Sequence, residues 1–439
     1  MFYILESDFQ LQRLEGLSRF PAYVDVIPSH YGLHPKLATT VGVYIRSVGS
    51  KESYVIPIDH PDGMNIEKER VQELLSKFTT LYCPDRKELL YHFCLDNTID
   101  LQLLYSMNKF DKIDVTRNSL NWFYNKHSDL NCINRVIPLP ILHKSCEELD
   151  EKLRPVIDFD IPEGFDFYNK TGTNVFYLIE QSGLNVYYEP YKELFKPRDI
   201  RLNTLDNTVF TNYNLYNATS RPTNAFNSVN FAAIPKSEAH RKCFRPKNDV
   251  FVEFDFDGYH LRLLSNEIVY ELTTESAHKQ LAKLYFGKEE ISDDEYARAK
   301  QINFHAIYGK IPEEHQNLPI FVKIKEYIDN LWKNFQENGV VNNPQSGKPY
   351  TKELKDMNPA KLMNYMMQSL ETSNNIAILK KVLSYLQNKK TSIALYTYDA
   401  ILFDFSKEDG KETLKDIENI LNENGKLPVK FKYSKDLVL

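Results

Sequence analysis

The chain has 439 residues, a formal net charge of −6, 42% hydrophobic residues and 26% charged residues. The length predicts about two or three domains of ordinary globular composition, and the acidic balance excludes a uniformly basic coat while allowing a local basic groove. The five cysteines are scattered without a C-x-x-C pair, which argues against a disulfide framework or a zinc site. Because we find neither a signal peptide nor an apolar run of about 18 residues, we expect an intracellular protein without a membrane span.

Residues 1–130 begin with strand-like runs (YVDVI, TTVGVYIRSV, SYVIPI) followed by helix-like segments, which predicts an α/β domain. Four acids stand out in it: Asp25, Asp85, Asp100 and Asp129. Carboxylates in this order resemble the 3′–5′ exonuclease domain of polymerases, in which an Asp-x-Glu pair and two further Asp residues hold two metal ions. Ile27 stands where that family has its Glu, so we expect a retained fold with weak or absent nuclease activity. Scattered surface acids on an unrelated α/β domain are the alternative.

The segment from 213 to 235 contains the run NLYNATSRPTNAFNSVNFAAIP. This run resembles the Thr-Gly-Arg … Asn-Leu-Gln-Asn-Ile-Pro stretch of family A DNA polymerases. Arg221 and Asn230 match this stretch, and Ser220 replaces its Gly. An Arg held by a tight turn suits the minor groove of a duplex, where shared acceptors permit contact with any sequence. Standing alone, it would be interpreted as a surface Arg in a loop.

The segment VFVEFDFDGYHLRL alternates apolar residues up to Asp255, as expected for a strand with one buried face. It resembles the first palm motif of the same family. The resemblance implies that Asp255 binds metal ions and that the backbone carbonyl of Phe256 also faces a metal. His260 stands where the family has the Glu that blocks a ribose 2′-hydroxyl, which leaves the sugar selectivity open.

Two further segments resemble the fingers helices of the family. In SAHKQLAKLYFG, His278 matches the His that contacts the incoming phosphates. In YARAKQINFHAIYG, Lys300, Phe304 and Tyr308 are four residues apart and so share one face of a helix. The resemblance implies a lysine on the triphosphate, a ring on the sugar and a ring beneath the templating base. Tyr296 replaces the family's Arg one turn earlier, which leaves two alternatives open: a lower affinity for the triphosphate, or compensation by another cation such as Lys310.

Residues 335–392 are rich in lysines, among them Lys348, which suits either phosphate neutralisation or a solvated helical face. Within this segment Asn364 and Gln368 lie one helical turn apart and match the palm helix that reaches a duplex minor groove. Asp399, in IALYTYDAILFDF, matches the second metal-binding Asp, with Ala400 in place of the family's Glu. Two strand-borne carboxylates that converge suit a pair of divalent cations. We therefore expect Asp255 and Asp399 to hold two Mg²⁺ ions, with Mn²⁺ as a substitute.

These motifs predict an α+β multidomain protein with a right-hand polymerase (palm, fingers and a reduced thumb) preceded by an α/β, ribonuclease H-like exonuclease-type domain. The expected boundaries are 1–135 for the exonuclease-like domain, 136–212 for the thumb and connection, and 213–439 for palm and fingers, with the fingers at about 268–335. The Pro-rich turn at Val136–Pro140 marks the first boundary.

The predicted function is a template-directed DNA polymerase that binds primer-template DNA and dNTPs as a cytoplasmic monomer, in the host cytoplasm if a phage encodes it, and works with replication accessory proteins. Asp255, Asp399 and Lys300 are its predicted catalytic residues. Three alternatives stay open. They are a single-subunit RNA polymerase, a non-catalytic polymerase-like DNA-binding protein, and a nuclease that uses the N-terminal acids.

Overall fold

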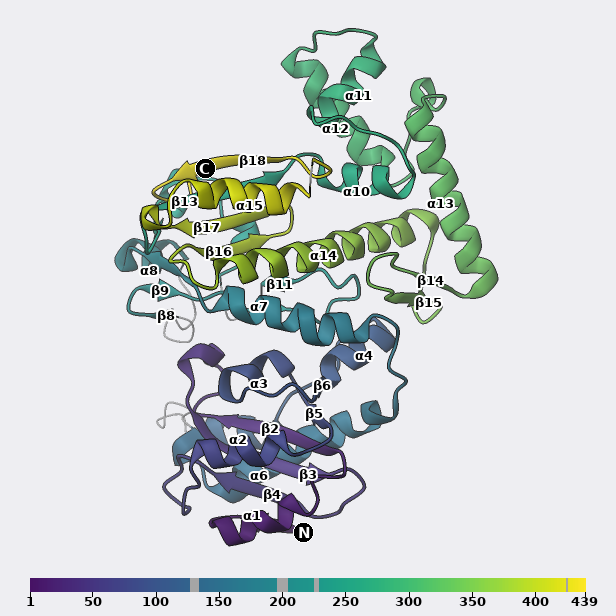
Figure 1. Ribbon diagram of the computed structural model, residues 1–439. Coiled ribbons are helices and arrows are strands. Elements are labelled where there is room, and N and C mark those ends of the chain that lie inside the picture. Colours follow the sequence, from purple (N-terminus) through teal and green to yellow (C-terminus); the bar gives the residue numbers. More distant parts are fainter. Residues whose placement is uncertain (127–133, 196–203, 225–228, 424) are drawn as a thin grey trace. The chain divides into compact units, whose positions relative to one another are not determined.

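The computed structural model describes residues 1–126, 134–195, 204–224, 229–423 and 425–439 (Figure 1). The chain forms two compact units. The first comprises Met1–Tyr177 and Pro197–Asp206, and the second comprises Leu178–Lys196 and Asn207–Leu439. None of the described helices is long and apolar enough to cross a membrane.

The first unit is built on a six-stranded mixed sheet in the order β1-β4-β3-β2-β5-β6. The central strands β2, β3 and β4 are antiparallel, whereas β1 runs parallel to β4, and β5 and β6 continue parallel to β2. Every residue of the three central strands is buried, as expected for a sheet covered on both faces. The strands are β1 (Phe2–Ile4), β2 (Ala22–Pro28), β3 (Thr40–Ser47), β4 (Ser53–Pro57), β5 (Leu81–Cys83) and β6 (Thr98–Asp100).

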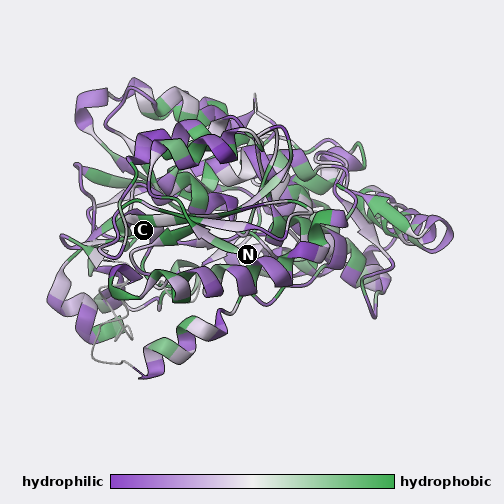
Figure 2. Cartoon of the chain, turned by 90° about the horizontal axis from the view of Figure 1, so that it is seen from below, coloured by the Kyte–Doolittle hydropathy of each residue, from purple (hydrophilic) through white to green (hydrophobic). Residues whose placement is uncertain are grey.

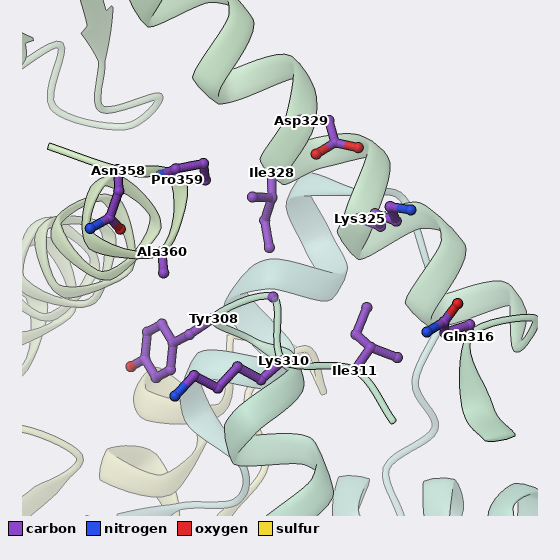
Figure 3. Close-up of a pocket in the computed structure, with 11 residues that line it drawn as sticks. Tyr308, Lys310, Ile311, Gln316, Lys325, Ile328, Asp329, Asn358, Pro359 and Ala360 are labelled. Atoms are coloured by element: carbon purple, nitrogen blue, oxygen red, sulfur yellow. The ribbon is translucent and has the colours of Figure 1, made fainter. Parts of the chain in front are cut away.

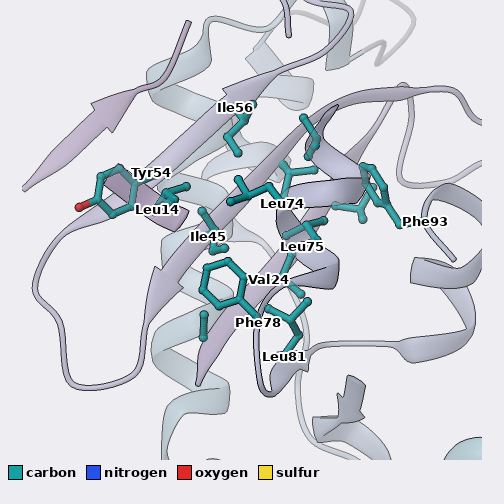
Figure 4. Packing of buried hydrophobic residues seen from close by; sticks show 14 of the residues in the cluster. Leu14, Val24, Ile45, Tyr54, Ile56, Leu74, Leu75, Phe78, Leu81 and Phe93 are labelled. Atoms are coloured by element: carbon teal, nitrogen blue, oxygen red, sulfur yellow. The ribbon is translucent and has the colours of Figure 1, made fainter. Parts of the chain in front are cut away.

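Helices accompany this sheet, and the first three of them share one hydrophobic core with it. Leu14 of α1, Leu74 and Leu75 of α2, and Val24 and Ile45 of the sheet pack together in this core (Figure 4). The helices are α1 (Asp8–Glu15), α2 (Lys68–Ser76), α3 (Arg86–His92), α4 (Leu101–Lys109), α5 (Asn118–Lys126), α6 (Leu139–Leu153) and α7 (Thr173–Glu180), the last of which continues into the second unit. Hydrophobic and hydrophilic residues mix along the helices and strands of the chain, which is typical of elements with one face in a core (Figure 2).

The second unit contains a four-stranded antiparallel sheet in the order β16-β17-β13-β18. Its strands are β13 (Val250–Phe256), β16 (Ser392–Thr397), β17 (Ala400–Phe405) and β18 (Val429–Ser434). The long helix α14 (Pro359–Leu386) packs against β16 and against α15 (Glu412–Asn422), which in turn packs against β18. Consequently the strand predicted to end in Asp255 lies in the middle of this sheet, between β17 and β18.

A group of helices projects from this sheet (Figure 1). Within it α11 packs against α12, and α13 packs against α14. The helices are α10 (Tyr259–Glu267), α11 (Ala277–Phe286), α12 (Asp293–Ala306) and α13 (Pro319–Asn338), followed by the hairpin of β14 (Val340–Asn342) and β15 (Pro349–Thr351). Shorter elements of the two units are α8 (Tyr188–Phe195), α9 (Glu238–Arg241), β7 (Leu184–Val186), β8 (Thr204–Leu205), β9 (Thr208–Val209), β10 (Tyr213–Asn214), β11 (Thr223–Asn224) and β12 (Phe244–Arg245).

Candidate active site

The two acids expected to converge do lie at the same end of the sheet. Asp255 is the penultimate residue of β13, and Asp399 lies in the turn between β16 and β17. In the strand register Asp255 is directly opposite Ala400, and the amide of Phe256 donates a hydrogen bond to the carbonyl of Asp399 (3.0 Å). Both acids line one cavity of about 1040 Å³. Two residues far apart in the sequence thus share a single environment.

The turn that carries Asp399 is fixed by α14. Tyr398 has φ 67, a left-handed conformation that is rare for a bulky residue. The side-chain amide of Asn375 donates to the carbonyl of Tyr398 (2.9 Å) and to the hydroxyl of Tyr396 (2.9 Å). Such a strained residue persists only where its surroundings over-determine it, which is common at functional sites. The buried helix α14 therefore sets the position of the acid that follows Tyr398.

The electrostatics of the two acids favour a bound cation. Burial, and then the carboxylate of Asp399, raise the pKa of Asp255 to about 6. Burial also raises the pKa of Asp399. Two carboxylates whose charges disfavour each other offer hard oxygen ligands, and Mg²⁺ is commonly held by one or two carboxylates together with substrate phosphates. Since the described residues contain no group of three or more metal-ligating side chains, the pair fits a metal completed by substrate and water rather than a closed protein cage.

The residues predicted on the fingers helix also line this cavity. Lys300 and Phe304 lie in α12, whereas Tyr308 follows in the turn after the helix ends at Ala306. The phenyl ring of Phe304 is 60% exposed and lies 5.7 Å from the ring of Tyr308 in an edge-to-face arrangement. The expectation of a single helix carrying all three residues is therefore wrong for Tyr308, which the turn nevertheless directs into the same cavity.

His278 lies at the start of α11 and lines the cavity beside Gly258, which follows the strand of Asp255. The side-chain amide of Asn303 lies 2.9 Å from its Nδ1, and burial lowers the pKa of His278 to about 4. Its imidazole is therefore neutral near pH 7. Gly258, just after β13, packs closely against Ala277 at the start of α11. It has φ 60, and an added Cβ would lie 3.1 Å from the Cβ of Ala277. Asp257 accepts a hydrogen bond from the amide of Ala277 (2.8 Å), which joins the end of β13 to the start of α11.

A buried acid that the sequence analysis missed connects several predicted residues. The carboxylate of Glu371 on α14 is 1% exposed and accepts from Arg221 (2.8 Å) and from Nε2 of His260 (2.9 Å). Nδ1 of His260 in turn lies 3.4 Å from the hydroxyl of Tyr308. The guanidinium of Arg221 also stacks on the ring of Tyr398 at 4.0 Å. The sequence offered little signal for this acid, because Glu371 stands among polar residues (QSLETSNN) and only its burial in the fold distinguishes it.

Lys348 holds the turn that precedes Arg221. Its ammonium donates to the carbonyl of Ala218 (2.9 Å) and to the hydroxyl of Ser220 (2.6 Å), and Ser220 has φ 62. Lys348 is 1% exposed, and burial lowers its pKa to about 7. Its interpretation as one of the phosphate-neutralising or solvated lysines is therefore wrong. It is a buried support for the Arg221 turn.

The remaining predicted DNA contacts fall in two places. Asn364 and Gln368 both line the cavity and are joined by a hydrogen bond (3.0 Å). Asn230 is exposed and precedes a 3₁₀ turn at Phe231–Ala233, outside the cavity lining. Lys310, the candidate substitute for the missing arginine, lines a different cavity of about 480 Å³ between the turn after α12, the helix α13 and the start of α14 (Figure 3). It therefore does not join the cations beside Asp255.

The acids of the first unit are engaged in structural contacts. Asp25 is 5% exposed and forms a two-pronged ion pair with Arg117 (2.7 and 3.0 Å). Asp85 caps α3 by accepting from the amide of Glu88 (2.9 Å), and Asp100 caps α4 by accepting from the amide of Leu103 (2.9 Å). The predicted fourth acid, Asp129, lies outside the described residues. As for the described acids of this unit, none belongs to a group that could hold a metal.

Comparisons with known proteins find a solved structure with a similar fold. No model of a protein family matches the sequence, and no curated protein matches it. The structure is similar to the POL domain of Pol1 from M. smegmatis in complex with DNA primer-template and dNTP, with a TM-score of 0.73 over 100% of this chain and 99% of that chain. The two sequences are 13% identical, so the likeness concerns the fold alone. The predicted polymerase type of fold is confirmed at that level.

Proposed function

We propose that the chain is a template-directed DNA polymerase that adds dNTPs to the 3′ end of a primer. The observation that carries this proposal is the meeting of Asp255 and Asp399 in a cavity whose other wall presents Lys300. The likeness of the whole fold to a polymerase domain solved with primer-template and dNTP supports it. In-line phosphoryl transfer needs positioning and charge stabilisation rather than a protein nucleophile, and this cavity offers both.

Asp255, Asp399 and the backbone carbonyl of Phe256 would hold the Mg²⁺ ions, for which Mn²⁺ could substitute. Bound there, the ions would lower the pKa of the primer 3′-hydroxyl and neutralise the triphosphate. Lys300 binds the phosphate oxygens as a point charge, and His278, being neutral, donates a hydrogen bond to them. Phe304 packs against the sugar, and Tyr308 lies beneath the templating base.

Arg221, Asn364 and Gln368 contact the minor groove of the primer-template duplex in this proposal, and Asn230 contacts it outside the cavity. Because the minor-groove acceptors are shared between base pairs, such contacts position DNA of any sequence. The hydrogen bond between Asn364 and Gln368 holds both amides on one side of α14, where each keeps a further donor for the duplex.

We further propose that the first unit is an exonuclease-type domain without nuclease activity. Arg117 supplies the positive charge that neutralises Asp25, and this ion pair occupies the carboxylate that metal ions would need. A 3′-labelled duplex with a mismatched primer end should therefore stay intact in the presence of Mg²⁺ and the absence of dNTPs. Shortening of that primer would contradict this part of the proposal.

A primer-extension assay with Mg²⁺ tests the polymerase proposal. The wild-type chain should extend the primer with dNTPs, and Asp255→Asn or Asp399→Asn should abolish extension while binding of the primer-template stays measurable. Extension that survives either substitution would remove the assignment. Binding of primer-template without extension by the wild-type chain would favour a non-catalytic polymerase-like protein.

One observation keeps an RNA polymerase as the second candidate. His260 stands at the position expected to exclude a ribose 2′-hydroxyl, and its Nε2 donates a hydrogen bond to the carboxylate of Glu371. The imidazole is bulky enough to obstruct the sugar. Its Nε2 donates to Glu371 and its Nδ1 lies 3.4 Å from the hydroxyl of Tyr308, so it presents less acceptor capacity to the nucleotide than a carboxylate would. Comparing the incorporation of rNTPs with that of dNTPs decides between the two. We expect dNTPs to be preferred.

A further inference from the structure

A second lysine stands beside the predicted catalytic acids. Lys430, on the edge strand β18, is directly opposite Asp255 in the strand register and lines the same cavity as Lys300. The sequence gives no hint of this, because the segment PVKFKY reads only as a short strand near the C-terminus. Only the pairing of β18 with β13 brings Lys430 to the cavity.

An ion pair positions Lys430 at the cavity while most of its side chain stays exposed. Its ammonium forms an ion pair with the carboxylate of Asp257, yet its side chain is 61% exposed. Asp257 has other donors, namely the amide of Ala277 (2.8 Å) and the guanidinium of Arg262 (3.4 Å). Only the ammonium of this pair faces solvent, because the Asp257 side chain is 5% exposed. The donors from Ala277 and Arg262 remain on the Asp257 carboxylate if the ammonium takes a more highly charged partner, so the buried charge is not left unpaired.

The surroundings of Lys430 indicate which partner it would take. Lys300, Lys430 and His278 all line this cavity, and both lysines contribute to the electrostatic environment of the imidazole. Lys430 also interacts electrostatically with Tyr296 and with Asp255. Tyr296 occupies the position at which the resemblance leads us to expect an arginine for the triphosphate. The sheet thus supplies this cavity with a cation in addition to Lys300 of α12.

We infer that Lys430 binds the phosphate oxygens of an incoming nucleoside triphosphate, together with Lys300 and His278. This inference rests on the proposed function, since it assigns a ligand to the same cavity. A polyphosphate anion carries enough charge to draw both ammonium groups, and two point charges on either side of it hold the chain of phosphates in line with the acids.

Kinetics of Lys430→Ala give the first test. In single-nucleotide extension the KM for dNTP should rise about tenfold, as expected for the loss of one charge-assisted contact, whereas kcat should change by less than about threefold. Lys430→Arg should recover most of the loss. The matched control is Lys415→Ala, which removes an exposed lysine of α15 outside the cavity lining. It should leave the KM unchanged. An unchanged KM in Lys430→Ala would overturn the inference and leave the polymerase proposal standing.

Direct binding separates the inference from the proposed function. Isothermal titration with dATP and with inorganic tripolyphosphate, in Ca²⁺ so that no turnover occurs, should show weaker binding of both to Lys430→Ala, while deoxyadenosine binding should be equal in both proteins. If the wild-type chain extends no primer but binds tripolyphosphate in a Lys430-dependent manner, the inference holds and the polymerase proposal fails. Equal binding of tripolyphosphate by the two proteins would refute the inference. Equal thermal midpoints would show that the variant is folded, and Lys430→Gln replaces it if they differ.

Discussion

Replacing Asp255 with Asn should stabilise the metal-free protein at alkaline pH while abolishing primer extension. Burial and the neighbouring carboxylate of Asp399 raise the pKa of Asp255 from 3.8 to about 6. A carboxyl group with a higher pKa in the folded chain favours folding while it is protonated, so stability falls as the pH rises from 3.8 through about 6. Above that pH the full free-energy cost of an ionised Asp255 in the folded chain is present, and an amide at position 255 carries no such cost.

The size of the effect follows from the pKa. One pKa unit corresponds to about 1.36 kcal/mol, so the difference between 3.8 and about 6 sets an upper limit of about 3 kcal/mol. Because the Asp255 side chain is exposed at the cavity, solvent reduces both the desolvation cost and the repulsion from Asp399, and we expect about 1 kcal/mol. For a unit of this size, that stabilisation raises the melting temperature by about 2–4 °C.

Thermal unfolding in EDTA at about pH 8 and about pH 4 measures the difference. The variant should melt higher than the wild-type chain at about pH 8, and the two should converge at about pH 4, where the folded-state carboxyl is protonated. Mg²⁺ should then stabilise the wild-type chain and not the variant. Asp329→Asn, an exposed acid in α13, serves as the charge control and should show neither effect. A variant that melts lower at about pH 8, or equal Mg²⁺ stabilisation of both proteins, would refute the idea that these acids repel each other until a cation joins them.

Three further changes test other parts of the site. Phe304→Tyr adds a hydroxyl beside the sugar and should raise the incorporation of dideoxynucleotides relative to dNTPs; an unchanged ratio in a competition assay would argue against Phe304 as the sugar contact. Glu371→Gln should weaken the contacts with both Arg221 and His260, so that primer-template affinity and discrimination against rNTPs both fall, by about tenfold each. A fall in only one of these two quantities would show that they are not linked through Glu371. Arg117→Ala should destabilise the first unit by about 3 kcal/mol or more, because it leaves Asp25 buried without its partner, and this is measurable by urea unfolding.

The strands and helices that carry the predicted motifs could be identified from local pattern. The alternation that ends in Asp255 predicts β13, and the acid-containing run around Asp399 predicts the β16–β17 hairpin. Both depend on residues that are neighbours in the chain. The convergence of the two acids was inferred through resemblance, and the strand register supplies its physical reason, since β13 and β17 are hydrogen-bonded up to Asp255 and Ala400.

The groups that sequence analysis missed owe their roles to contacts across the fold. Glu371 could be recognised only as an unexplained acid on α14, because its partners Arg221 and His260 come from other elements. Lys348 resembled its solvated neighbours in the lysine-rich segment, and burial against the Ser220 turn decides otherwise. No spacing rule connects such residues, because tertiary packing rather than helical or strand periodicity brings them together.

These missed groups share one feature, which is that each stands beside a departure from the family's motif. The turn that should contain Gly has Ser220 at φ 62, and Lys348 donates to its hydroxyl. The position that should carry a Glu has His260, and the buried carboxylate of Glu371 meets its ring. A side chain in a left-handed turn and an imidazole beside a buried acid are each costly alone, and each is offset by the contact that the fold places next to it. The two substitutions are therefore better understood together with their tertiary partners than as losses, which is consistent with the phosphoryl transfer proposed for this cavity.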